Sequence, residues 1–160
     1  MRPTGVYNMV MKKRSRSVGR ISNRRARFDY ELGDSLMVGI QLTGAETKSL
    51  RMGHGQLQGA YVTVKDNELW LINSQIIGSS GVPIGEDDKS RSRKLLAKRR
   101  EIDKLIAEKQ NGRTIVPLEL LTGGRYIKLR ISVGKGKKHY DKRETLKKRQ
   151  QQRDIDRQIR

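Results

Sequence analysis

The chain has 160 residues, with 36 Lys and Arg against 17 Asp and Glu, two His and no Cys, and its formal net charge is +19. One domain is expected, since a domain takes about 100–200 residues. So high a charge indicates a polyanionic partner, nucleic acid first and an anionic membrane surface second. The lack of Cys excludes disulfides, thiolate metal sites and cysteine nucleophiles. No apolar run reaches the ~18 residues of a membrane span or forms a signal peptide, so we expect a water-soluble intracellular protein.

The positive charge is concentrated at the two ends of the chain. Residues 1–27 carry nine basic residues and no acidic one, and residues 134–160 carry eleven basic and four acidic ones. Such blocks are typical of arms that bind nucleic acid and are disordered without it. We therefore predict a basic flexible extension (1–22), a folded body (23–133) and a basic tail (134–160). A transit peptide is the alternative for the N-terminal segment, but it leaves the basic C-terminus unexplained.

Hydrophobic periodicity predicts mostly strands in the body. In chain order, strands are expected at 36–42, 61–64, 69–72, 114–121 and 126–133. The second and third strands flank an Asp-Asn turn, which is a hairpin signal. Gly123 and Gly124 are expected to form a second tight turn with positive φ at both residues. Pro117 cannot donate to a ladder, so we expect an edge or a bulge there.

Two helices and a loop complete the predicted body. A short helix is expected at 45–52 and a longer one at 93–110, with Ser92 as its N-cap, whereas 78–90 is rich in turn formers and predicts a loop. Leu95 and Leu96 are adjacent, so one of them is expected at the edge of the apolar stripe. An exposed Leu96 could pack on an unstacked base, and core packing is the alternative. For Trp70, the only Trp, core packing is favoured over base stacking.

Together these elements predict a mainly β protein, a small OB-like antiparallel barrel with two or three short helices and two basic disordered arms. Such barrels often present one sheet face to RNA. In the last strand Lys128 and Arg130 alternate with apolar residues, which gives a core face and a basic face. Lys94 and Lys98 are predicted to add a basic helix face. The alternative to an RNA-binding barrel is a β-sandwich that binds no nucleic acid. The alternative role for the basic side chains is to keep the protein soluble.

The sequence contains no recognisable catalytic constellation. His54 and His139 have no metal-ligand spacing, and neither a nucleophile elbow nor a complete phosphate loop is present. An acidic stretch at 86–88 is more often solvated than a cation site. We therefore expect no catalytic residue, metal or cofactor, and a binding protein rather than an enzyme.

Six blocks in order from residue 23 to the end resemble the family of SsrA-binding proteins, also called small protein B. They are NRRAR at 23–27, GIQLTGAETKSLR at 39–51, GAY at 59–61, RSRKLL at 91–96, REIDKL at 100–105 and GKGKKHYDKRE at 134–144. Any one block is weak, but six in register are highly specific. The first 20 residues look like an extension outside the resemblance.

The family consists of bacterial ribosome-rescue factors, so the resemblance implies an RNA-binding protein of the cytoplasm that acts in trans-translation. Its barrel would hold the tRNA-like domain of transfer-messenger RNA (tmRNA). Its partners would be that RNA, the small-subunit RNA of the ribosome at the decoding centre and, indirectly, elongation factor Tu with the alanylated RNA. We expect a monomer, and neither DNA nor a membrane as a partner. The alternatives are a structural ribosomal protein and a general RNA chaperone, with an RNA-modifying enzyme disfavoured by the missing catalytic groups.

The resemblance also implies roles for single residues. RNA-facing positions fall on Asn23, Arg25, Leu96, Lys128 and Met37, where the family often has a Glu that, unlike Met, can accept a hydrogen bond. Positions at the decoding centre and along the messenger channel fall on Gly136, Lys137, Lys138, Tyr140, Asp141, Lys142 and Arg143. To the RNA-binding set we add Lys48 and Arg51, which with Glu46 could otherwise form a surface network on the short helix.

The tail can form a helix but has little with which to pack it. Residues 141–160 contain no Gly or Pro, and their only aliphatic residues are Leu146, Ile155 and Ile159. Most helical stability in proteins comes from packing an apolar face. We therefore expect the tail to be disordered in the free protein and helical in the empty messenger channel, where it would stand in for the missing codon–anticodon pairing.

Overall fold

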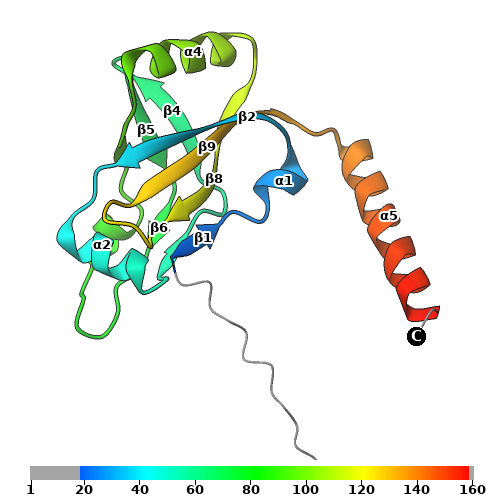
Figure 1. Ribbon diagram of the computed structural model, residues 1–160, viewed down its shortest axis with the longest axis horizontal. Helices are drawn as coiled ribbons and strands as arrows, with labels where there is room; N and C mark the ends of the chain where they lie inside the picture. The colour runs from blue at the N-terminus through cyan, green and yellow to red at the C-terminus, as the bar shows by residue number, and fades with distance from the viewer. Residues whose placement is uncertain (1–18, 159–160) are drawn as a thin grey trace, which may run out of the picture.

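The computed structural model describes residues 19–158, so most of the predicted N-terminal extension lies outside the described residues. The described elements are, in chain order, β1 (Arg20–Ser22), α1 (Ala26–Asp29), β2 (Tyr30–Ile40), α2 (Gly44–Arg51), β3 (Gly55–Gln56), β4 (Tyr61–Lys65), β5 (Glu68–Ile72), β6 (Gln75–Ile76), α3 (Glu86–Lys89), β7 (Arg93–Leu96), α4 (Arg99–Gln110), β8 (Thr114–Leu121), β9 (Lys128–Gly136) and α5 (His139–Gln158). Figure 1 shows the strands gathered in one body and α5 standing apart from it.

Six strands close a barrel. They are hydrogen-bonded in the order β8–β4–β5–β7–β2–β9, and β9 pairs with β8 to complete the ring. β4 contributes a single residue pair to its neighbour β8, Val62 opposite Ile115, and β1 pairs with the end of β8, where Arg20 lies opposite Leu121. Every pairing of this sheet among residues 19–158 is antiparallel, so the predicted mainly β class with a small barrel is confirmed. Residues 20–22, placed in the flexible extension by the sequence, belong to this sheet.

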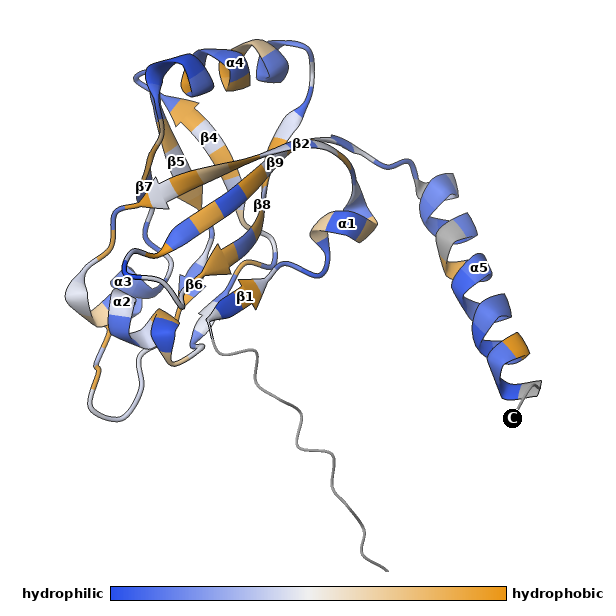
Figure 2. Cartoon of the chain, viewed as in Figure 1, coloured by the Kyte–Doolittle hydropathy of each residue, from blue (hydrophilic) through white to orange (hydrophobic). Residues whose placement is uncertain are grey.

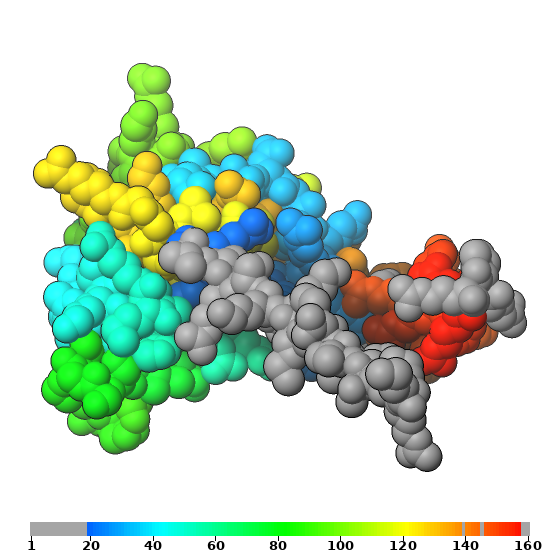
Figure 3. Space-filling model, turned by 60° about the horizontal axis from the view of Figure 1, so that its bottom comes forward, coloured from blue at the N-terminus to red at the C-terminus, as the bar shows by residue number. Residues whose placement is uncertain are grey.

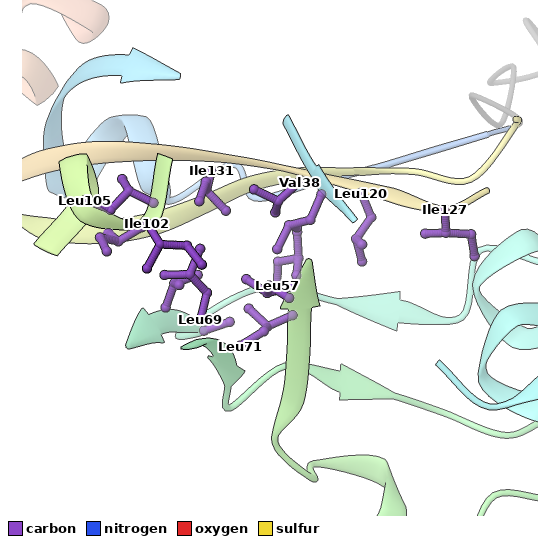
Figure 4. Close-up of a cluster of buried hydrophobic side chains, with 14 of the residues drawn as sticks. Val38, Leu57, Leu69, Leu71, Ile102, Leu105, Leu120, Ile127 and Ile131 are labelled. Carbon is purple, nitrogen blue, oxygen red and sulfur yellow. The ribbon is translucent and has the colours of Figure 1, made fainter. Parts of the chain in front are cut away.

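The inside of the barrel is filled by aliphatic side chains from every strand of the ring. Leu69 and Leu71 of β5 and Leu129 and Ile131 of β9 are at most 1% exposed and belong to one cluster. Figure 4 shows Leu69, Leu71 and Ile131 within it. Full burial of such a side chain stabilises the fold by about 1.5–3 kcal/mol. The helix α4 covers one end of the barrel and α2 lies at the other end (Figure 1). This leaves the outer faces of the strands for polar and charged residues.

The local sequence explains some turns and not others. Asp66 and Asn67 have φ of 52° and 61°, which makes the predicted β4–β5 hairpin a tight turn with both central residues left-handed. The predicted tight turn at Gly123 and Gly124 is wrong, because neither residue has positive φ and Leu121 pairs with Lys128 across a six-residue loop. The pairing register of β8 and β9 shifts just after Pro117, which confirms the predicted bulge.

The predicted helix at 93–110 is wrong in its first part. Residues 93–96 form strand β7, which closes the barrel between β5 and β2, and the helix α4 begins only at Arg99. Ser92 therefore does not cap a helix. Arg93 and Leu95 face inwards while Lys94 and Leu96 face outwards, an alternation of period two. Pairing with strands distant in sequence outweighs the helical propensity of Lys and Leu, so the four residues are extended.

Polar residues dominate the long C-terminal helix. Figure 2 shows α5 almost entirely hydrophilic, in contrast to the alternating strands of the barrel. No helix within residues 19–158 combines the length and the apolar composition needed to cross a bilayer.

Candidate nucleic-acid interface

Lys128 and Arg130 project from the outer face of β9. Leu129 and Ile131, which alternate with them, are fully buried, so the strand phase predicted from the sequence is confirmed. Met37 of β2 lies opposite Arg130 in the antiparallel ladder. Three of the predicted RNA-binding residues therefore share one surface, which we call the β9 face.

Leu96 extends the β9 face across β2. Its ladder partner on β2 is Gly39, which in turn lies opposite Lys128. A Cβ on Gly39 would come within 3.2 Å of the Leu96 Cβ, so Leu96 lies over the glycine. Leu96 is 54% exposed whereas Leu95 is buried, and the cause is strand alternation rather than the edge of a helix. An exposed Leu beside a cation is a surface on which an unstacked base can pack.

Glu119 of β8 holds two arginines at this surface. Its side chain is 5% exposed, and one carboxylate oxygen lies 2.8 Å from Nη1 of Arg130. The other oxygen pairs with Nε of Arg20 on β1. A buried charge is stable only when paired, so Glu119 fixes the position of both guanidinium groups. Glu119 is not among the residues predicted from the sequence, because its partners come from two other strands.

Lys48 and Arg51 lie on the exposed side of α2. Nη2 of Arg51 donates a hydrogen bond of 3.0 Å to the carbonyl oxygen of Arg125, in the loop that leads into β9. The guanidinium of Arg125 lies 5.4 Å from the ring centroid of the exposed Tyr126. Figure 3 shows this loop, in yellow, beside the cyan α2. The cations of α2 are thus continuous with the β9 face through the loop.

Glu46 is not part of a surface network, contrary to the sequence-based expectation. It is buried, and its carboxylate lies 2.5 Å from Nη2 of Arg91 and 2.9 Å from Nη2 of Arg93. Burial alone would raise the pKa of the Glu46 carboxyl, but the bonds from Arg91 and from the N–H of Thr43, with the charge of Arg93, lower it overall. Glu46 is therefore ionised, and its ion pairs connect α2 to Arg93 of β7 and to Arg91 in the segment before that strand.

Arg93 connects the segment before β7 to the barrel. Its side chain is 0% exposed and donates to the carbonyl oxygens of Ser74 at 2.9 Å, Asp88 at 2.9 Å and Arg91 at 3.0 Å. Burial lowers the pKa of this guanidinium, and the adjacent Glu46 opposes that effect. A fully satisfied buried arginine of this kind fixes the path of the chain beside α2.

Lys94 and Lys98 do not form the basic helix face that the sequence predicted. Lys94 lies on β7 opposite Trp70, and its Nζ is 2.5 Å from a carboxylate oxygen of Glu68. Lys98 is exposed and directly precedes α4. Trp70 is half-buried on this outer side, because its neighbours in β5 occupy the interior; the expected core position is therefore wrong.

Asn23 and Arg25 lie at the start of α1 and differ in exposure. Nδ2 of Asn23 donates to the carbonyl oxygen of Pro117 at 3.0 Å, and its Oδ1 accepts from the N–H of Ala26 at 3.3 Å. Asn23 therefore anchors α1 to β8, and it presents the exposed Arg25 beside it. The structure gives Asn23 a structural role next to the one that the resemblance implies.

The predicted tail residues fall on β9, on α5 and on the two residues between them, Lys137 and Lys138. Gly136 is the last residue of β9 and pairs with Tyr30, so the strand runs beyond the predicted body. The next residue, Lys137, donates its N–H to the carbonyl oxygen of Asp29 at 2.9 Å. The remaining predicted residues from Tyr140 to Arg143 lie in the first turns of α5.

An ion pair joins the start of α5 to the body. Nζ of Lys142 lies 2.9 Å from Oδ1 of Asp29. Tyr140 is largely exposed and donates its hydroxyl to Glu144, one turn further along the helix. Within residues 19–158 no cluster of His, Asp or Glu is arranged to hold a metal ion.

Comparison with known families gives a specific match. The family model described as SmpB protein matches residues 20–160. The chain belongs to the SmpB family. It is 48% identical over 138 residues to the SsrA-binding protein of Trichormus variabilis, covering 84% of this chain and 88% of that one. It is 43% identical over 138 residues to that of Streptococcus thermophilus, covering 86% and 90%.

A solved structure also resembles this SmpB-family chain. It is described as "tmRNA-SmpB: a journey to the center of the bacterial ribosome" and superposes with a TM-score of 0.63 at 36% identity. The match covers 76% of this chain and 86% of that one. The family resemblance inferred from the six sequence blocks is thus confirmed.

Proposed function

We propose that this protein binds the tRNA-like domain of tmRNA and delivers it to stalled ribosomes for trans-translation. The observation that carries the proposal is the β9 face, where Lys128, Arg130 and the exposed Leu96 lie side by side on the outside of the barrel. Cations bind phosphates and an exposed apolar side chain packs on a base, so the face combines two modes of RNA contact. The names of the relatives support the same partner.

The body would bind the RNA, and the tail would detect whether the messenger channel of the ribosome is empty. The helix α5 begins three residues after β9 and presents Lys142 and Arg143 in its first turns. In the empty messenger channel these residues would reach the decoding centre, and a bound messenger would exclude them. The protein would act in the cytoplasm, with elongation factor Tu carrying the alanylated RNA as an indirect partner.

The helix would form fully only on the ribosome. Of its side chains, Leu146 and Ile155 are aliphatic and exposed, so no apolar face holds it to the barrel. A helix that packs against nothing has only marginal stability in water. It would therefore become ordered only when the ribosome provides a surface for it to bind.

Crosslinking in cells, followed by sequencing of the bound RNA, tests the proposal. The expected result is one dominant small RNA, tmRNA, crosslinked through the body, together with small-subunit RNA crosslinked through α5. A structural ribosomal protein would instead be stoichiometric with intact subunits. Recovery of many unrelated RNAs in equal amounts would favour a general RNA chaperone and contradict the proposal.

A further inference from the structure

We propose that a cleft between β1 and the end of α2 binds a phosphate group of the RNA backbone, as a second contact beside the β9 face. The inference rests on the proposed RNA-binding function and adds a site to it. The cleft has a volume of about 610 Å³ and is lined by Arg20, Arg24, Arg51 and His54 among others. No Asp or Glu belongs to the described residues that line it. A concave surface of one charge sign concentrates ions of the opposite sign.

The end of α2 places His54 in this cleft. Gly53 has a φ of +87°, and its N–H donates to the carbonyl oxygen of Leu50, while the N–H of His54 donates to that of Ser49. These two bonds form a Schellman motif, which needs a residue such as glycine in the left-handed region. They also satisfy the last carbonyl groups of α2, so the helix end presents fewer free acceptors to an anion.

One ring nitrogen of His54 is shielded inside the protein, although the residue lines the cleft. Its Nδ1 is inaccessible to solvent and has no hydrogen-bond partner among the described residues. Buried polar atoms are rarely left unpaired, and a bound ion or water is a frequent reason when one is. Nδ1 itself is closed off from the cleft by protein atoms, so His54 contributes to the site as one of the residues that line it.

Two of the three arginines that line the cleft are held in position by other residues of the protein. Glu119 holds Arg20, and the carbonyl oxygen of Arg125 holds Arg51. Arg24 is exposed and has no ion pair with any described residue, so its charge is available to a ligand. Cations fixed in advance lose less entropy when they bind.

Continuity with the β9 face identifies the ligand as RNA rather than a free anion. Arg51 lines the cleft and also contacts the loop that leads into Lys128. A nucleic-acid backbone lying across Lys128 and this loop continues towards the cleft, whereas a small anion would use only one end of this surface. The chemical group recognised is a phosphodiester, which carries no base information, so the cleft would set the register of the RNA.

The test uses two substitutions in the full chain, Arg24→Ala and His54→Ala. Binding to the tRNA-like domain of tmRNA is measured across a range of salt concentrations. Loss of one phosphate contact should lower the slope of log K against log salt by about one. At low salt Arg24→Ala should weaken binding about tenfold, as expected for one charge-assisted hydrogen bond. Arg113→Ala, an exposed arginine at the α4 end of the barrel, is the matched control and should bind like the unchanged protein.

Phosphate-ethylation interference then locates the contact. With the unchanged protein, ethylation of one phosphate that lies at the cleft should weaken binding. With both cleft variants, ethylation of that phosphate should have no further effect, while ethylation of phosphates near Lys128 should still weaken binding. If both variants bind normally and Lys128→Glu binds weakly, the cleft proposal is wrong and the proposed function stands. If Lys128→Glu also binds normally, the proposed function itself fails. Binding of inorganic phosphate to the cleft with no change in RNA affinity would equally overturn the inference.

Discussion

Glu46 of α2 and Arg93 of β7 form an ion pair inside the protein, 2.9 Å apart, with 2% and 0% of their side chains exposed. The same carboxylate caps its own helix, since Oε2 of Glu46 accepts the N–H of Thr43 at 2.8 Å. One side chain therefore connects the start of α2, a barrel strand and, through Arg91, the segment before β7. The cations on the exposed side of α2 depend on this connection for their position.

Replacing Glu46 with Gln should destabilise the protein strongly. The amide keeps the size of the carboxyl but leaves the buried charge of Arg93 unpaired, which typically costs about 3–5 kcal/mol. Urea unfolding at pH 7 measures the loss. Glu101→Gln, on the partly exposed start of α4, is a matched control with a much smaller expected effect. A midpoint unchanged by Glu46→Gln would contradict the structural role.

The same pair predicts a loss of stability in acid. The pKa of Glu46 is lower in the folded state than its ordinary value of 4.5, so its contribution is fully present above that pH. It is lost as the pH falls below 4.5 towards the folded pKa, because the proton then binds the unfolded chain more readily. The free energy of unfolding measured between pH 7 and pH 3 should therefore fall more steeply in the unchanged protein than in Glu46→Gln. Parallel curves would contradict the predicted shift.

The two neighbouring leucines of β7 should respond in opposite ways. Leu95→Ala removes a buried side chain and should destabilise the fold by about 2–5 kcal/mol. Leu96→Ala removes an exposed one, so stability should change by no more than ~0.5 kcal/mol while RNA affinity falls. Thermal unfolding and binding to the tRNA-like domain give the two readouts. Unchanged RNA affinity in Leu96→Ala would remove this residue from the interface.

Reversing the charge of Lys128 should separate binding from stability. Lys128→Glu places a negative charge on the β9 face, so affinity for the RNA should fall and its salt dependence should weaken. The thermal midpoint should hardly change, since only the outer side of β9 is altered. Lys109→Glu, on α4, is the control and should leave RNA affinity as it is. A similar loss in both variants would mean that net charge alone drives the binding.

In the free protein the amides of the second half of α5 should exchange quickly with solvent. The ion pair between Lys142 and Asp29 is half-exposed, and such pairs contribute about 0–1 kcal/mol, which cannot hold a long helix. Hydrogen exchange measured with and without stalled ribosomes checks this, with protection expected only in the complex. Strong protection in the free protein would show that the helix is stable by itself and would contradict folding on the ribosome.

The sequence predicts those parts of the structure that are determined by interactions between residues close together in the chain. The β4–β5 hairpin and the alternation of β9 follow from neighbouring residues, and both predictions are confirmed. For residues 93–96 the sequence predicts a helix, whereas they form strand β7, because the extended form comes from pairing with β5 and β2, which are distant in sequence. For the same reason the sequence does not indicate that Glu46 and Glu119 are buried ion-pair centres, since their arginine partners come from other elements.

The candidate site was predicted in part. Alternation correctly predicts Lys128 and Arg130 on the outside. Of the two positions that the sequence leaves open for Leu96, the structure shows the exposed one, on a strand rather than a helix. The pairing of Lys94 with Glu68 and the cleft beside His54 depend on how distant segments meet, so no local pattern could reveal them. The roles of these residues in RNA binding stay predictions for the experiments above.

The most direct test of the proposed mechanism is peptide tagging of stalled chains in a reconstituted translation system. The full chain is compared with a chain that lacks residues 141–160, and the binding of each to the tRNA-like domain and to ribosomes is measured in parallel. This deletion keeps β9 and the whole barrel, so both binding steps should be retained while tagging is abolished. Alanines in place of Asp141, Lys142 and Arg143 should weaken tagging in the same direction. Full tagging by the shortened chain would contradict the proposal that the tail senses the empty messenger channel.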